Sequence, residues 1–385
     1  MRIVHINFDA GLTGGATIAM RRIHRALMQH DVDSLIVCRM LPDIAGSRSV
    51  PRGLWGRTML FGWRVLMKLT AGCCRSTGLV YTGLCKTINS LHPDAVILHW
   101  IQNDTISVSE LRKIKAPVFW FHHDLWPIRG VTAYEWFNVP PRLEWLDRLA
   151  KWNKQRIARL MGNRVVPVCA SRWVSDEICK SGMYEHEPVV IPLPLDEVFR
   201  PGVRTPGHKF RILNGAQGGL DAGIKGGDRL LSALHLISEV EKQDMEVVIF
   251  GSEGKEIIQS GVPIRFVGRL HGEALAQAYR DADVFAFPSR QETFGQTKIE
   301  ALACGTPVVA FDETACAEGI EHKKTGWIAS PDNIAGYAEG IRYFYHAWKS
   351  GNAVRVEPRT QYGATVVAEQ WLKMIRQEVS AEGRR

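Results

Sequence analysis

The clearest hydrophobic pattern in the chain lies in its C-terminal half. Residues 284–287 are a short apolar run that ends at Pro288, which is typical of a buried strand in a parallel sheet. Apolar residues then recur at helical spacing over 296–304, and Gly305 ends this helix. A second apolar run follows at 308–311. The pattern therefore predicts a strand, a loop, a helix and a strand in succession.

The same alternation of apolar runs and amphipathic helices extends along most of the chain. Prolines and glycines cluster at 192–208, which indicates a linker, and a helix is expected at 360–379. We therefore predict an α/β protein with two doubly wound, Rossmann-like domains facing across a cleft, at 1–195 and 209–358. The strands are expected at 2–8, 34–38, 94–100, 117–122, 165–170, 189–191, 210–214, 246–251 and 264–268.

The helix predicted at 296–304 starts at the carboxyl end of the strand before it, where ligands bind in α/β sheets. The backbone N–H groups of Gly295, Gln296 and Thr297 would open this helix, and together with the helix dipole they stabilise an anion. Glu292 lies on the preceding loop, and Glu300 lies one turn inside the helix. Carboxylates beside an anion site suit hydroxyl groups, which donate hydrogen bonds to them. These residues predict a site for a nucleotide diphosphate that carries a sugar.

This stretch resembles the family-4 retaining glycosyltransferases of the GT-B fold. The sequence PSRQETFGQTKIEALACGTPVVA at 288–310 is similar to that family's paired-glutamate motif, with Glu292 and Glu300 separated by seven residues. The resemblance implies transfer of a hexose, with retention, from a UDP- or GDP-sugar to a saccharide hydroxyl, as in enzymes of bacterial exopolysaccharide and capsule biosynthesis. It also implies that the helix at about 360–380 crosses back onto the N-terminal domain, and that Arg290 and Phe294 belong to the donor site.

A second glycine-rich loop, GAQGGLDAGIKGG, follows the strand at 210–214. Lys225 precedes a helix there, where a lysine neutralises the two phosphates of a departing diphosphate. The resembled family carries an arginine earlier in this loop, but this chain has Gln217 or Gly218 at that position. Arg290 is a candidate replacement. A surface lysine flanking a helix is the plainer explanation of Lys225.

An H-D-x-W-P stretch follows the strand predicted at 117–122. In the resembled family, such a stretch implies that His123 contacts the donor sugar, so we expect His123, Lys225 and Glu292 to be the catalytic residues. Asp124 and Trp126 are then expected on the acceptor side, and Gly15 is expected to face the cleft. Without the family, His123 is a polar strand end, and Gly15 belongs to a tight turn. A metal site at His123 lacks a third ligand nearby.

The net charge of +8 is unevenly distributed, since residues 44–93 contain no acidic side chain. A basic amphipathic helix expected at 53–69 would suit an anionic membrane or a polyprenyl-diphosphate-linked acceptor. A helix packed on the sheet with its charges in water explains the same pattern. The aromatic and basic stretch at 133–163 is expected over the acceptor cleft, with single-stranded nucleic acid as the alternative ligand. We expect no nucleic-acid partner, because no nucleic-acid fold motif accompanies the charge.

The remaining composition narrows the class of protein. Eight scattered cysteines without a Cys-x-x-Cys pair indicate a reducing compartment without disulfides, and no run of 18 apolar residues occurs. We therefore expect a cytoplasmic protein, peripheral at most to the inner face of the plasma membrane. Asp281 and Asp283 form a D-x-D sequence at the amino end of a strand, away from the ligand edge, so we expect a polar turn there. We expect no metal and no cofactor besides the nucleotide sugar co-substrate.

Two other function classes fit the same scaffold. A nucleotide-sugar epimerase of GT-B architecture would use water in place of an acceptor, and analysis of the products formed without acceptor separates it from a transferase. A non-catalytic protein that binds nucleotide sugars would fit the absent loop arginine. Tight donor binding without turnover would identify this third class.

Overall fold

Two separate sheets, each made from the predicted short apolar runs, form the core of the chain. The computed structural model describes residues 1–382 apart from 12–13, 41–45, 51–57, 59–60, 62–64, 66–75, 134–138, 206, 208, 216–222 and 358. The chain divides into an N-terminal unit, Met1–Pro194 with Ala364–Arg385, and a C-terminal unit, Leu195–Gly363. Both units alternate strands and helices around a mainly parallel sheet, so the predicted α/β class with two Rossmann-like units is confirmed.

The N-terminal unit contains a parallel seven-stranded sheet in the order β3-β2-β1-β4-β5-β6-β7. Its strands are β1 (Arg2–Ile6), β2 (Asp33–Cys38), β3 (Ser47–Ser49), β4 (Ala95–Leu98), β5 (Val118–His122), β6 (Val165–Cys169) and β7 (Val189–Val190). Its helices are α1 (Gly15–Met28), α3 (Leu84–Ser90), α4 (Glu144–Met161), α5 (Arg172–Ser181) and α11 (Ala364–Glu382), with short 3-10 helices at Val108–Lys113, Trp126–Ile128, Pro141–Leu143 and Gly162–Arg164.

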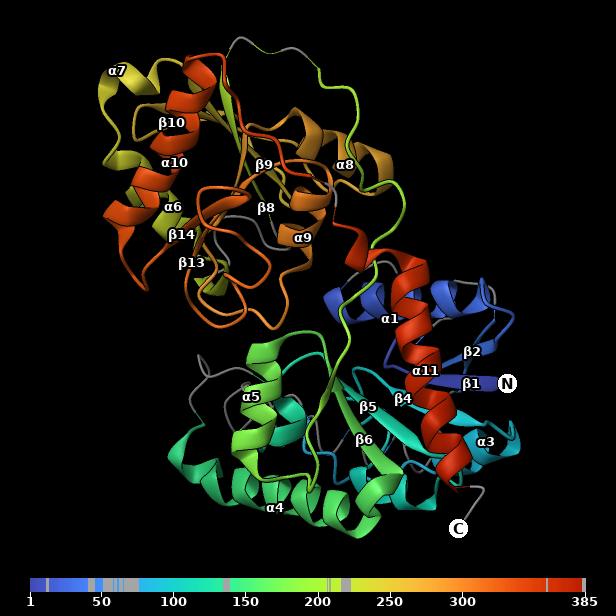
Figure 1. The fold of residues 1–385 in the computed structure, drawn as a ribbon. Coiled ribbons are helices and arrows are strands. Elements are labelled where there is room, and N and C mark those ends of the chain that lie inside the picture. The colour runs from blue at the N-terminus through green and yellow to red at the C-terminus, as the bar shows by residue number, and fades with distance from the viewer. Residues whose placement is uncertain are drawn as a thin grey trace. The chain divides into compact units, whose positions relative to one another are not determined.

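Helices cover both faces of this sheet, which explains why its strands are apolar along their length. On one face, α11 packs beside α1, and Trp371 of α11 lies 5.8 Å, ring to ring, from Phe121 of β5. On the opposite face, Ile157 and Met161 of α4 share a core with Trp120 of β5. Figure 1 shows α1 and α11 together on one side of these strands and α4 on the other.

The C-terminal unit has a seven-stranded sheet in the order β10-β11-β9-β8-β12-β13-β14, parallel except between β10 and β11. Its strands are β8 (Phe210–Gly215), β9 (Met245–Phe250), β10 (Ile257–Gln259), β11 (Val262–Phe266), β12 (Val284–Phe287), β13 (Val308–Phe311) and β14 (Gly326–Ala329). Its helices are α6 (Gly227–His235), α7 (Glu239–Lys242), α8 (Gly272–Asp281), α9 (Gln296–Ala303) and α10 (Ile334–Lys349), with 3-10 helices at Gly223–Lys225 and Thr360–Tyr362.

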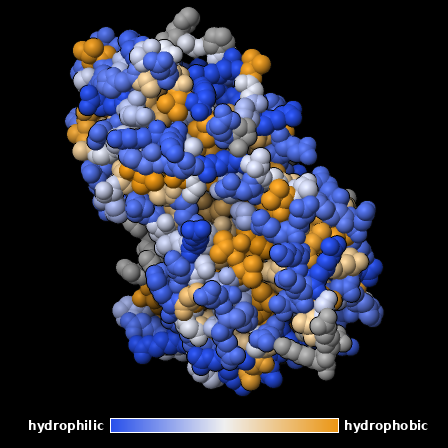
Figure 2. All heavy atoms as spheres, in the orientation of Figure 1, coloured by the Kyte–Doolittle hydropathy of each residue, from blue (hydrophilic) through white to orange (hydrophobic). Residues whose placement is uncertain are grey.

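In this unit α6 and α10 cover one face of the sheet, where Leu230 and Ile341 share a core with Val284. Tyr279 of α8 packs at 5.4 Å, ring to ring, on Phe285 at the opposite face. On the side drawn in Figure 2, hydrophilic residues cover most of the C-terminal unit, and hydrophobic residues are scattered among them. No helix within the described ranges is both long enough and apolar enough to cross a membrane.

Two predicted features need separate mention. The basic helix expected at 53–69 lies outside the described residues, apart from Thr58, Phe61 and Val65. At the D-x-D sequence, Asp283 forms an ion pair with Arg204 at 2.6 Å, and one oxygen of Asp281 accepts a hydrogen bond from the backbone N–H of Thr205. Both carboxylates therefore bind groups of the chain itself at the amino end of β12.

Candidate functional site

The loop after β12 leads directly into the N-terminus of α9. Gly295, the residue before α9, has φ 79° and ψ 63°, in the left-handed region that favours glycine. A Cβ atom there would lie 2.9 Å from Cζ of Phe287, so a side chain would also collide with the strand. Glycine thus lets the chain turn sharply from the carboxyl end of β12 into α9. The turn brings the first-turn amides, which include that of Thr297, to the edge of the sheet where an anion is stabilised.

Lys225 and Glu292 meet beside this helix. Lys225 ends the 3-10 turn before α6, and its Nζ atom lies 2.6 Å from Oε1 of Glu292. The same carboxylate oxygen accepts a hydrogen bond of 3.0 Å from the Ser289 hydroxyl. Gly226, with φ 69°, allows this approach, because a Cβ atom there would lie 2.0 Å from the carbonyl oxygen of Pro288. The structure therefore brings together two of the three residues that the sequence predicts to be catalytic.

A neighbouring loop, residues 313–318, fixes the backbone around Glu292. The N–H of Glu292 donates to Oγ1 of Thr314 at 2.9 Å, and the N–H of Ala315 donates to the carbonyl oxygen of Glu292 at 3.2 Å. The buried Lys298 of α9 donates to the carbonyl oxygens of Ala315 and Glu318, each at 2.7 Å. Burial lowers the pKa of Lys298 to about 8. Sequence reasoning missed this support, although Lys298 stands inside the recognised motif.

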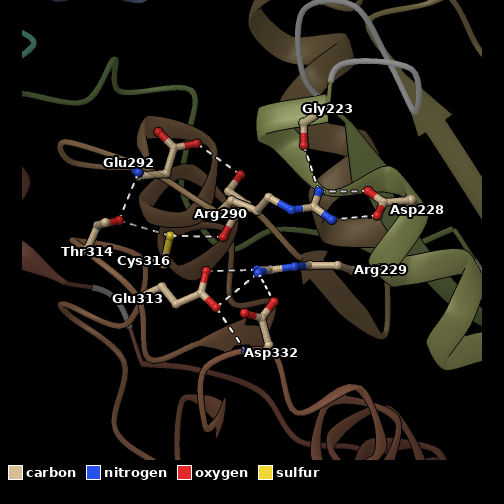
Figure 3. A network of polar contacts seen from close by, with 10 residues as sticks. Gly223, Asp228, Arg229, Arg290, Glu292, Glu313, Thr314, Cys316 and Asp332 are labelled. Carbon is tan, nitrogen blue, oxygen red and sulfur yellow. Dashed lines mark hydrogen bonds and ion pairs between the residues drawn. The ribbon is translucent and has the colours of Figure 1, made fainter. Parts of the chain in front are cut away.

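The predicted substitute for the loop arginine, Arg290, is held by an acidic partner. Its guanidinium group donates to both carboxylate oxygens of Asp228, at 2.7 and 2.5 Å, and to the carbonyl oxygen of Gly223 at 2.7 Å (Figure 3). The hydrogen bond raises the pKa of Arg290 and lowers the pKa of Asp228. A role for Arg290 at a diphosphate would therefore require exchange of Asp228 for phosphate. Gln217 and Gly218 lie outside the described residues.

A second arginine, Arg229, is buried near the same end of the unit. Arg229, in the first turn of α6, donates to the two carboxylate oxygens of Glu313 at 2.8 and 3.1 Å and also forms an ion pair with Asp332 (Figure 3). Its guanidinium lies 4.6 Å from the ring centroid of Phe311. Nothing in the sequence motif indicated these contacts, because the residues come from three separate segments.

Two further predicted donor residues are buried. Glu300 of α9 accepts a hydrogen bond of 3.2 Å from the Tyr279 hydroxyl. Phe294 packs its ring edge-on against Tyr362, at 6.0 Å between centroids. In the N-terminal unit, Gly15 is the first residue of α1. The roles expected for these three residues stay predictions.

The H-D-x-W-P stretch of the N-terminal unit lies at the carboxyl end of β5. Nε2 of His123 lies 2.9 Å from Nδ1 of His99. Asp124 accepts hydrogen bonds from the Trp126 backbone, the Trp100 indole and the Gln102 amide, at 2.9, 3.1 and 2.6 Å. Burial raises the pKa of Asp124 to about 6, while these hydrogen bonds lower it. Asp124 therefore stabilises the loop through internal hydrogen bonds.

Trp126 is also an interior residue, with 1% of its surface exposed. Its indole N–H donates to the Ser76 carbonyl oxygen at 2.8 Å. The buried Lys154 of α4 lies 3.6 Å from the indole centroid and donates to the carbonyl oxygens of Trp126, Arg129 and Gly130. Trp126 therefore supports its loop from inside the core, and its expected acceptor-side role stays a prediction.

Comparison with known proteins places this geometry in a family. Residues 215–347 match the family profile described as glycosyl transferases group 1. A D-inositol 3-phosphate glycosyltransferase of Jonesia denitrificans is 40% identical over 124 residues, 29% of each chain. The sulfoquinovosyl transferase SQD2 of Arabidopsis thaliana is 30% identical over 160 residues, 39% of this chain and 31% of that protein. The chain thus spans about a third or less of the length of these relatives.

Solved structures match over nearly the whole chain. Sucrose-phosphate synthase from Thermosynechococcus elongatus has a TM-score of 0.70 at 16% identity, with 99% of each chain covered. Anabaena Alr3699/HepE in complex with UDP-glucose has a TM-score of 0.63 at 15% identity, also with 99% of each chain covered. At these identities the likeness concerns the fold alone, and it is the two-unit fold of GT-B glycosyltransferases. Residues 215–347 are therefore similar to the glycosyl transferases group 1 family, within a chain of GT-B fold.

Proposed function

We propose that the chain is a retaining glycosyltransferase that moves a hexose from a UDP- or GDP-sugar to a hydroxyl group of a saccharide acceptor in surface polysaccharide biosynthesis. The observation that carries this proposal is the Lys225–Glu292 pair, 2.6 Å apart beside the N-terminus of α9 in the group 1 domain. A cation, helix amides and a hydroxyl-accepting carboxylate are the groups that a sugar diphosphate needs.

Each group has a distinct part in the proposed reaction. Lys225 and the first-turn amides of α9 stabilise the negative charge that develops on the departing diphosphate. Glu292 and His123 hold the sugar, and Glu300 holds the ribose. The acceptor attacks from the face that the diphosphate leaves, and the diphosphate takes the acceptor proton, so that configuration is retained without a covalent intermediate. In this scheme lysine and backbone donors supply the positive charge, and no metal ion is used.

Similar proteins support the donor class. One relative, from Mycolicibacterium smegmatis, is a GDP-mannose-dependent alpha-mannosyltransferase, 38% identical over 95 residues that make up 24% of this chain and 25% of that protein. The Anabaena structure contains UDP-glucose. A nucleoside diphosphate sugar with either base fits a site whose phosphate contacts come from backbone amides and Lys225.

We also propose that the acceptor is lipid-linked and that the chain contacts an anionic membrane surface. The support comes from the outer face of α4, formed by Trp145, Arg148, Leu149, Trp152, Arg156, Arg159 and Leu160. Trp145 and Trp152 are 63% and 55% exposed, although the opposite face of the same helix is core. Exposed tryptophans interleaved with arginines suit the headgroup region of a bilayer and its anionic lipids.

The experiment that tests the proposed function uses purified protein with UDP- and GDP-sugars, with and without saccharide acceptors. We expect transfer that continues in the presence of a chelator and that Glu292→Ala abolishes. Glu256→Ala, which alters an exposed glutamate of the same unit, should retain full activity. Transfer by Glu292→Ala at the wild-type rate would contradict the assignment.

The products separate the two alternatives from a transferase. An epimerase of GT-B architecture would convert the donor without an acceptor and would leave no glycosylated product. A non-catalytic binding protein would bind a nucleotide sugar tightly in calorimetry but turn over none of the donors and acceptors supplied.

A further inference from the structure

Four histidines and a serine form one hydrogen-bonded chain through the N-terminal unit. Nδ1 of His24 lies 2.7 Å from the Ser34 hydroxyl oxygen, which lies 3.1 Å from Nε2 of His5. Nδ1 of His5 lies 2.9 Å from Nε2 of His99, and Nδ1 of His99 lies 2.9 Å from Nε2 of His123. This row of hydrogen bonds joins α1 to His123, the catalytic candidate at the end of β5.

Strand register explains how these residues meet. Ser34 of β2 pairs with Ile3 of β1, two residues before His5, and His5 pairs with Ile97 of β4, two residues before His99. Because side chains alternate along a strand, residues two apart share a face of the sheet. Ile97 pairs in turn with Phe119 of β5, four residues before His123. The side chains of Ser34, His5, His99 and His123 therefore lie on one face of the sheet. From β2 to β5, each lies two residues closer to the carboxyl edge of the sheet than the one before it.

Burial disfavours the charged form of His5, His99 and His123. His5, His24 and His99 are each 2% exposed or less. Burial lowers the pKa of His5 and His99 well below 6.5 and the pKa of His123 to about 3, and neighbouring histidines lower those of His5 and His99 further. A neutral imidazole has one N–H donor and one acceptor nitrogen.

Two arrangements of protons run in one direction through the whole row of hydrogen bonds. In the first, His24 donates to Ser34, Ser34 to His5, His5 to His99, and His99 to Nε2 of His123, so that Nδ1 of His123 carries its proton. In the second, every bond reverses, and the proton of His123 is on Nε2. In a third arrangement Ser34 accepts from both His24 and His5, and the proton of His123 is again on Nε2. From His5 to His123, a switch in one bond requires a switch in every bond.

We propose that His24, Ser34, His5 and His99 are positioning residues that together fix which ring nitrogen of His123 carries the proton. They would thereby decide whether Nδ1 of His123 donates or accepts a hydrogen bond. This inference rests on the proposed function, in which His123 holds the donor sugar. A sugar hydroxyl can donate a hydrogen bond to Nδ1 or accept one from it. The tautomer of His123 therefore selects the orientation of the hydroxyl that it binds.

The test is Ser34→Ala, which removes only the link between His24 and His5 and leaves the His99–His123 contact in place. In protein with 15N-labelled histidine, NMR shifts of the His123 ring nitrogens report its tautomer. We expect a mixed or reversed tautomer in Ser34→Ala and recovery in Ser34→Thr, which restores the hydroxyl. The kcat/KM for transfer should fall about twofold to tenfold in Ser34→Ala, because part of the protein is then in the wrong tautomer.

The control is His122→Gln. His122 is buried at the end of β5, and it bonds to the Tyr184 hydroxyl at 3.0 Å instead of to a member of the row from His24 to His123. This variant should therefore leave the His123 shifts unchanged. Folded Ser34→Ala protein with wild-type His123 shifts would overturn the proposal, whether or not the protein catalyses transfer. The proposed function is tested separately by His123→Ala, whose transfer activity should be lost.

Discussion

The ammonium group of Lys225 lies 2.6 Å from the carboxylate of Glu292, and the Ser289 hydroxyl donates to the same carboxylate oxygen. The pair joins a cation suited to a leaving diphosphate to a carboxylate suited to sugar hydroxyls. Donor binding would therefore exchange this ion pair for contacts of both residues with the donor. Each side chain is already close to its place in the reaction, which lowers the entropy cost of assembling the site.

Replacement of Lys225 tests the electrostatic part of this account. We predict that Lys225→Met lowers kcat for transfer roughly 100-fold, since one charged donor to the departing oxygens is lost. Lys324→Met is the matched control, because Lys324 lies in the same unit with its side chain 80% exposed. Steady-state kinetics with a saturating donor would measure the effect. Equal kcat in the two variants would exclude Lys225 from leaving-group stabilisation.

The glycine after Lys225 provides a sharper geometric test. Gly226→Ala would place a Cβ atom 2.0 Å from the Pro288 carbonyl oxygen at φ 69°, whereas Gly223→Ala in the same turn meets no atom within 4 Å. We predict that Gly226→Ala lowers the unfolding free energy by about 2 kcal/mol or more and weakens UDP or GDP binding. Calorimetric unfolding and ligand titration would measure both effects. If both variants behaved like wild type, the close approach of this loop to β12 would be wrong.

The outer face of α4 predicts binding to anionic membranes. We expect the protein to sediment with vesicles that contain phosphatidylglycerol, and less with vesicles of phosphatidylcholine or at high salt. Replacement of Trp145 and Trp152 by serine should weaken binding roughly tenfold or more, because two interfacial anchors are lost. Tyr81→Ser, an exposed aromatic of the same unit outside α4, should have little effect. Equal binding by the double variant and the wild type would show that α4 does not contact the membrane.

Buried histidines predict that acid destabilises the N-terminal unit. Burial, with smaller contributions from the neighbouring His123 and Lys154, lowers the pKa of His122 to about 3. Between pH 6.5 and 3 the unfolded chain binds a proton that the folded chain does not, so the unfolding free energy falls as the pH falls. For His122 the loss from pH 6.5 to 5 is about 2 kcal/mol.

Urea unfolding from pH 7.5 to 5 measures this effect, and His122→Gln should reduce the slope. The pKa values of His5 and His99 are lowered in the same direction, so the loss for the wild type should exceed that of His122 alone. Stability that does not change over this range would show that the folded protein takes up protons at these histidines as readily as the unfolded chain does.

The sequence predicted what local patterns encode. Apolar runs located most of the parallel strands, although β3 and β14 were missed, and the paired-glutamate motif located α9 and the loop that bears Glu292. The antiparallel strand β10 was missed, because its three residues carry no distinct pattern. Contacts between distant segments were also missed, among them Arg229 with Glu313 and His5 with His99, which is 94 residues away. These contacts depend on strand order and register, which one sequence does not specify.

The same limit applies to the H-D-x-W-P stretch. Its position at a strand end followed from the apolar run before it. The burial of Asp124 and Trp126 depends on Trp100, Gln102 and Lys154, which belong to other elements. These internal contacts could not be predicted from the stretch itself, and the acceptor-side roles that the resemblance implies for Asp124 and Trp126 stay predictions.

The most direct test of the central claim is a crystal structure with bound UDP or GDP. The account predicts that phosphate oxygens accept hydrogen bonds, at about 3 Å, from the first-turn amides of α9 and from Nζ of Lys225. Glu292 should lie free of Lys225, at the position of the missing sugar. A nucleotide bound with its phosphates distant from both α9 and Lys225 would contradict the account.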